Sequence, residues 1–226
     1  MRGARLVLVL ILAALPASSQ SDSATEPVIQ IEFSHPGLTP SHWVLTLHPD
    51  GSGHFLSDRE NAHPAATQTT LEPQLETPNQ DRDIHLSATF SDHLFQVARE
   101  ESYFNKDCES HLKVAFQGSK KLSYSGADGH GACTFNYAND KEMRALADSL
   151  MTVSATILEG ARLEMLLRFD RLGLDKETEY MVIASHGGQL QQLCAIRGIL
   201  ERLADDPMVM ERVRKRAREL LAREEK

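Results

Sequence analysis

Apolar and polar residues alternate with the period of a β-strand through the first part of the chain. Residues 28–33 follow this alternation, and residues 42–55 follow it on both sides of a Pro-Asp-Gly turn. We predict a strand over 28–33 and a hairpin over 42–55, closed by Gly51 in the left-handed conformation. In this hairpin Leu45 lies opposite Phe55, so one face is apolar and is expected to meet the core.

Further strand signals follow. The pattern predicts a strand near 84–90, and then a helix that is capped by Ser91. A second hairpin is predicted to pair residues 112–116 with residues 122–124, which sets Phe116 opposite Leu122. The stretch from Cys133 onward fits one more short strand.

From Asn139 the apolar spacing changes to three and four residues, which is the period of a helix. Asn139 and Glu142 fit a capping box, and the helix is expected to continue to Phe169 with Gly160 in its interior. Three shorter helices are predicted: one around 178–185, one through 190–203, and one that begins near Met208 with Asp206 as N-cap and Pro207 in the first turn.

These elements predict an α+β fold, with a small antiparallel sheet of hairpins packed on one short and one long helix and followed by a C-terminal helical segment. We place the α+β domain at 27–139, and the long helix with the helical segment at 140–226. Residues 58–80 are rich in Pro, Thr and Gln, and they are interpreted as a flexible loop within the domain.

The N-terminus has the pattern of a secretory signal peptide over residues 1–19. Arg2 and Arg5 precede an apolar run from Leu6 to Leu15, and Pro16 and small residues follow. The run is shorter than the roughly 20 residues that span a bilayer, and no later run is comparable. We therefore expect a protein that is exported to the periplasm or secreted, with no stable membrane span after cleavage.

Export would place the three cysteines of the chain in an oxidising compartment, where disulfides persist. Cys108 and Cys133 flank the predicted second hairpin, whereas Cys194 lies in a distant helix. We predict that Cys108 pairs with Cys133. Cys194 is interpreted as a small buried helix residue, with intermolecular pairing as the alternative.

The net charge of the chain bears on the class of partner that it can bind. The formal net charge is -8, and residues 20–140 contain 7 Lys and Arg against 17 Asp and Glu. An acidic surface disfavours nucleic acid as a partner. The last helix contains a basic cluster of Arg212, Arg214, Lys215, Arg216 and Arg218. A solvated helix face is the default interpretation of this cluster, and a site for an anionic partner is the alternative.

Candidate chemistry is sparse. His48 and His54 are diagonal neighbours on the polar face of the first predicted hairpin, within reach of one metal ion, but the spacing specifies no third ligand. Neither a nucleophile turn nor a phosphate-binding glycine loop is present. The sequence thus predicts no cofactor and no metal, with His48 and His54 as the candidates if a metal is held.

The order of hairpin, strand, helix, cysteine-flanked hairpin and long helix, over roughly residues 28–160, resembles exported bacterial domains of unknown function. The final helices are similar to one helical repeat of the HEAT kind. These resemblances imply no catalytic residues. We interpret the chain as an exported, non-catalytic interaction or binding module of the cell envelope, with another envelope or secreted protein as partner. The alternative is a periplasmic hydrolase that uses a metal or a carboxylate pair.

Overall fold

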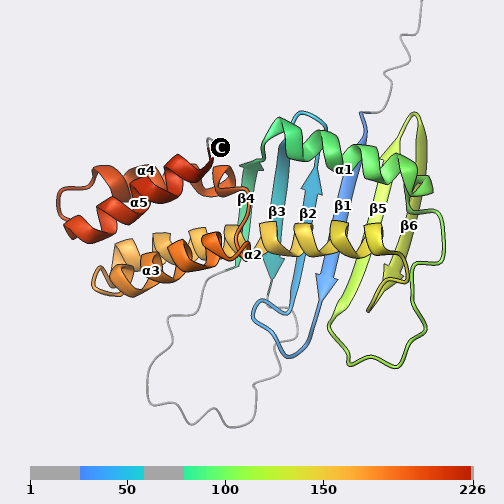
Figure 1. The fold of residues 1–226 in the computed structure, drawn as a ribbon, viewed down its shortest axis with the longest axis horizontal. Coiled ribbons are helices and arrows are strands. Elements are labelled where there is room, and N and C mark those ends of the chain that lie inside the picture. The colour runs from blue at the N-terminus through green and yellow to red at the C-terminus, as the bar shows by residue number, and fades with distance from the viewer. Residues whose placement is uncertain (1–25, 59–78, 225–226) are drawn as a thin grey trace, which may run out of the picture.

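The computed structural model describes residues 26–58 and 79–224, and it has the predicted α+β fold (Figure 1). One antiparallel sheet has the strand order β4-β3-β2-β1-β5-β6. The strands are β1 (Val28–Ser34), β2 (His42–Leu47), β3 (Ser52–Asp58), β4 (Gln80–His85), β5 (Ser119–Gly126) and β6 (Gly129–Phe135). The helices are α1 (Ala88–Glu100), α2 (Lys141–Phe169), α3 (Gly173–His186), α4 (Arg197–Asp205) and α5 (Glu211–Glu224), with short 3-10 turns η1 (Ser102–Phe104) and η2 (Leu193–Ile196).

The sheet has one apolar and one polar face. The first predicted hairpin is confirmed in its exact register, with Leu45 opposite Phe55 and Thr46 opposite His54. Gly51 has the predicted positive φ, and a Cβ there would lie 2.4 Å from the carbonyl oxygen of Leu86. Helices α1 and α2 cross the same face of the sheet (Figure 1), and they bury its alternating apolar side chains. We call the opposite, polar face the open face.

Two apolar clusters lie along α2. The first core combines the sheet, α1 and α2 as far as Ile157, and the second core combines α2 from Leu163 onward with α3, α4 and α5. The long helix therefore belongs to both cores, and the change of core falls within the helix rather than at residue 140. Gly160 stands at this point. A Cβ there would lie 2.3 Å from Ile196 Cγ2, so glycine permits the close approach of η2 to α2.

The prediction of the second hairpin is wrong. Strand β5 pairs with β6 across a two-residue turn, so that Leu122 lies opposite Cys133. Residues 112–116 form no strand, and Leu112 and Phe116 are exposed. The observed pairing places Leu122, Cys133 and the neighbouring aromatic residues on the helix-covered face next to β1, whereas the alternating stretch 112–116 belongs to the connection between α1 and β5.

Three predicted helix starts are also shifted. Ser87, not Ser91, caps α1, because β4 ends at His85 and Ser91 is buried inside the helix. Asp140, not Asn139, caps α2, since its carboxylate accepts hydrogen bonds from the backbone N–H groups of Glu142 and Met143. Asp206 instead accepts from the Met208 N–H within a turn, and α5 begins at Glu211.

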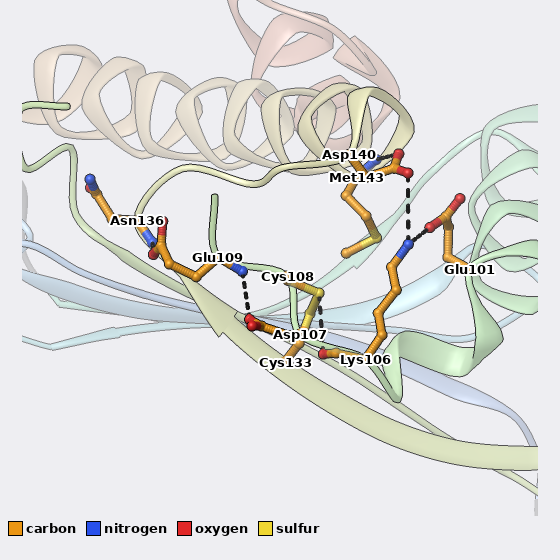
Figure 2. The surroundings of a disulfide bond; sticks show 9 residues. All are labelled: Glu101, Lys106, Asp107, Cys108, Glu109, Cys133, Asn136, Asp140 and Met143. Carbon is orange, nitrogen blue, oxygen red and sulfur yellow. Dashed lines mark hydrogen bonds and ion pairs between the residues drawn. A yellow bond between two sulfur atoms is a disulfide. The ribbon is translucent and has the colours of Figure 1, made fainter. Parts of the chain in front are cut away.

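The connection between α1 and β5 is held to the sheet through the predicted cysteine pair (Figure 2). Cys108 and Cys133 lie at disulfide distance, with 2.06 Å between their sulfur atoms. Glu109 accepts a hydrogen bond from the Asn136 backbone N–H at 2.7 Å, and Lys106 forms ion pairs with Glu101 and Asp140. The pair therefore joins the connection to edge strand β6, and it does not flank the second hairpin as predicted.

The predicted signal peptide at 1–19 and most of the predicted loop at 58–80 lie outside the described residues. The predicted bounds of that loop overlap two strands by one residue each, because Asp58 is the last residue of β3 and Gln80 is the first residue of β4. No helix in the described ranges is both long enough and apolar enough to cross a membrane.

Candidate functional site

A cavity of about 1120 Å³ lies where the free edge of the sheet meets the second core. Its walls are the start of β4, the last three turns of α2, and residues of α4 and the turn that follows it. We call this cavity the junction pocket. In Figure 1, α2 runs across the sheet and then continues past β4 to the other helices.

Four arginines and three acidic residues line the junction pocket. Arg82 donates to Glu164 at 2.8 Å, and Arg171 pairs with Asp206 at 3.4 Å. Arg168 and Arg202 form no ion pair within the part of the chain that the structure describes. The pocket therefore contains two arginines whose charge is not balanced by a direct carboxylate partner, which is the arrangement that recruits an anionic ligand.

The wall between these arginines is apolar. Ala161, Met165 and Leu167 of α2 are buried and line the pocket, and Phe169 is 65% exposed at the helix end. The Arg168 guanidinium lies 4.9 Å from the centre of the Phe169 ring, a distance that fits a cation–π contact. The Nε atom of Arg82 is buried without a hydrogen-bond partner. Apolar surface beside convergent cations is typical of ligand sites.

The predicted histidine candidates are not brought together in a metal site. Each ring nitrogen of His54 faces a carboxylate of β4, Asp83 at 2.9 Å and Asp81 at 3.1 Å. The Nδ1 atom of His48 is buried without a hydrogen-bond partner. Among the described residues no group of three or more His, Cys, Asp or Glu side chains is arranged to hold a metal ion.

The basic cluster of α5 is largely paired inside the molecule. Arg212 and Arg216 both contact Asp175 of α3, at 2.6 and 2.8 Å, and Arg214 and Arg218 both pair with Glu211. These contacts bind α5 to α3 and to its own first turn. The cluster is thus a partly solvated helix face whose four arginines are ion-paired, and Lys215 is its one member without an ion-pair partner among the described residues.

One carboxyl pair was not found from the sequence. Glu159 of α2 neighbours Glu177 of α3, and burial together with the Glu177 carboxyl raises the pKa of Glu159 to about 7. Arg162 donates from Nε to Glu177 at 2.5 Å, while Oε2 of Glu159 is buried without a hydrogen-bond partner. The pair lies within the α2–α3 interface, and neither carboxyl lines the junction pocket.

The sequence offered little that could locate the junction pocket. Arg82, Arg168 and Arg202 lie on three separate elements, each in a pattern that also fits an ordinary solvated surface. Only their convergence marks them as a site. Comparison with protein-family models and with curated proteins gave no match, so the geometry of this site is the main guide to function.

Proposed function

We propose that the protein is an exported, non-catalytic binding module that holds an anionic group of its partner in the junction pocket. The observation that carries this proposal is the presence beside an apolar wall of Arg168 and Arg202, which have no carboxylate partner among residues 26–58 and 79–224. A guanidinium binds a carboxylate or phosphate through two parallel hydrogen bonds, and partial burial strengthens such bonds.

The rest of the molecule is acidic, which makes the pocket distinctive. A chain of formal net charge -8 repels anions at long range, so an anion would bind only where cations are concentrated locally. The junction pocket supplies such a place. The α5 cluster supports this role less well, because its arginines are already occupied by Asp175 and Glu211.

Export is the second part of the proposal. It is supported by the signal-like pattern over residues 1–19 and by two cysteines at disulfide distance, which fit an oxidising compartment. An envelope or secreted protein is therefore the partner class that we expect.

A periplasmic hydrolase is the second candidate, and Glu159 with Glu177 is the observation that favours it. A buried carboxyl with a pKa of about 7 has the properties of a general acid. The binding function is better supported, because this pair lies at the contact of α2 and α3 and does not line the junction pocket. A hydrolase substrate panel, run with Glu159→Gln as the matched inactive variant, tests the candidate directly.

The binding proposal is tested by calorimetric titration of the chain from residue 20 with benzoate and with inorganic phosphate. We expect saturable binding of at least one of them, and a loss of about tenfold or more in affinity for the double variant Arg168→Gln/Arg202→Gln. Lys176→Gln/Lys215→Gln is the matched control, since it removes two exposed cations that do not line the pocket. Equal binding by both double variants would refute the proposal.

A further inference from the structure

Strand β4 stands at one end of the sheet, and among the described residues no strand pairs with its outer edge. It stands last in the strand order and pairs only with β3. The Leu86 N–H donates to the Gly51 carbonyl in continuation of the β3–β4 register, and backbone direction alternates along a strand. The backbone groups of Arg82 and Ile84 therefore point toward β3, and those of Asp81 and Asp83 point outward.

The junction pocket lies over the position that an added strand would occupy. Glu164 of α2 contacts Arg82 of β4, and Arg168 lies one helical turn farther along the same side of α2. One turn advances about 5.4 Å, and neighbouring strands are about 4.8 Å apart. Because α2 crosses the strands (Figure 1), Arg168 is expected above the place of the next strand beyond β4.

The two sides of such an added strand would meet opposite charges. Side chains on the helix side would enter the junction pocket, toward Arg168 and Arg202. Side chains on the other side would lie beside Asp81 and Asp83, whose side chains are 77% and 96% exposed on the open face. An extended segment fits when its acidic residues fall on alternate positions, since strand side chains alternate between faces.

We propose that the partner of the junction pocket is an extended peptide segment that pairs with the free edge of β4 and directs alternate acidic side chains to Arg168 and Arg202. This inference rests on the proposed binding function and specifies its partner. The cavity of about 1120 Å³ has room for the side chains of an extended segment. The accessible part of β4 is limited by η2, which contacts the strand, and beyond His85 the Ser87 N–H donates to the Gln192 side chain.

The probe is a fluorescent peptide with the sequence acetyl-Thr-Glu-Val-Glu-Val-Glu-Thr-amide, measured by anisotropy against the chain from residue 20. Three matched peptides accompany it: one with Gln in place of each Glu, one with the same composition but consecutive Glu residues, and one with alternate backbone nitrogens methylated. We expect the first peptide to bind at least about tenfold more tightly than each of the others.

Hydrogen exchange then locates the peptide. Saturation is expected to slow exchange of the Asp81 and Asp83 backbone amides by at least about tenfold, with little change at Ile84, whose amide already points toward β3. Arg168→Gln is expected to weaken the alternating peptide by about tenfold, whereas Lys215→Gln leaves it unchanged.

The possible failures separate the two proposals. Binding of benzoate or phosphate that depends on Arg168 and Arg202, without preference for the alternating peptide, would retain the anion site and overturn strand addition. Equal binding of the methylated peptide would also overturn it. A concentration-dependent dimer that protects the same amides would assign the edge to a second copy of this chain instead.

Discussion

The two cores that share α2 are stabilised by different kinds of contact. The first core is a helix-covered sheet face of alternating apolar residues, with Cys108 and Cys133 at disulfide distance at one edge. The second core encloses polar groups among its apolar residues, including Glu177 and the fully buried Thr178, and Glu159 lies beside them. Polar groups are buried beside the first core as well, Lys120 among them, but the second core adds two neighbouring carboxyls, so we expect its stability to depend more strongly on pH.

The largest expected effect comes from the centre of the first core. Phe55 is fully buried between Trp43 and the helices, and Phe55→Ala is expected to lower the free energy of unfolding by about 3–5 kcal/mol. The single tryptophan, Trp43, lies in this core, so its fluorescence follows the unfolding of the first core. Circular dichroism at 222 nm follows the unfolding of the helices. We expect the fluorescence transition in urea to shift more than the helical one.

Leu200→Ala is the matched substitution in the second core, where Leu200 is also fully buried. It should shift the helical transition more than the fluorescence transition. Coincident shifts in both variants would mean that α2 couples the two cores into one cooperative unit.

Removal of the cysteine pair is expected to have the next largest effect. Cys108→Ala/Cys133→Ala releases a constraint across a sequence separation of 25 residues, which on the chain-entropy estimate lowers stability by about 3 kcal/mol. The loss should appear in Trp43 fluorescence under oxidising conditions. Cys194→Ala serves as the control, and an equal loss in that variant would contradict the assignment of the stabilising contact to Cys108 and Cys133.

Changes of pH should distinguish the second core. The pKa of Glu159 is raised from 4.5 to about 7 in the folded chain, so the folded state holds a proton that the unfolded state releases. The contribution is therefore fully present below pH 4.5 and is lost as the pH rises through 7. Glu177 and Arg162 are the charged groups that face this carboxyl.

We expect Glu159→Gln to flatten the fall in stability between pH 4.5 and 7, and to stabilise the chain at pH 8 by about 1–2 kcal/mol, allowing for partial solvent screening. Unfolding by urea, followed by circular dichroism at several pH values, measures this. An unchanged slope in the variant would show that Glu159 titrates normally.

The smallest effect is expected at the α3–α5 contact. Arg212 is exposed, and Asp175 keeps its contact with Arg216 when Arg212 is replaced. Arg212→Gln should therefore cost less than about 0.5 kcal/mol at low salt, and the difference should disappear at high salt as screening increases. Thermal melts of this variant beside Lys215→Gln measure it, and a large, salt-independent loss would contradict the assignment.

Local sequence patterns correctly predicted the elements whose conformation depends on residues close by in the chain. The register of the first hairpin followed from strand alternation and Gly51, and the cysteine pair followed from the choice among three cysteines. The stretch 112–116 alternates equally well, yet tertiary pairing of β5 with β6 excludes it from the sheet. Alternation identifies a candidate strand but does not identify its partner.

Features that depend on distant residues were not predictable. Ser102, Tyr103 and Phe104 all have positive φ, and the Tyr103 ring packs over Gly129 and near Tyr124, contacts that no local pattern indicates. The junction pocket has the same origin, since its arginines come from β4, α2, the turn after α2, and α4. Sequence reasoning instead selected the dense α5 cluster, whose charges are mostly paired within the fold.

The central claim is that the junction pocket between the two cores binds an anion through Arg168 and Arg202. The most direct measurement is an NMR titration of the arginine Nε–H signals with benzoate, assigned by the Arg168→Gln and Arg202→Gln variants. The account predicts saturable shifts of these two signals at a common dissociation constant, with the Arg212 signal unchanged. Shifts at Arg212 without shifts at Arg168 and Arg202 would contradict the account and would indicate that the anion binds to α5.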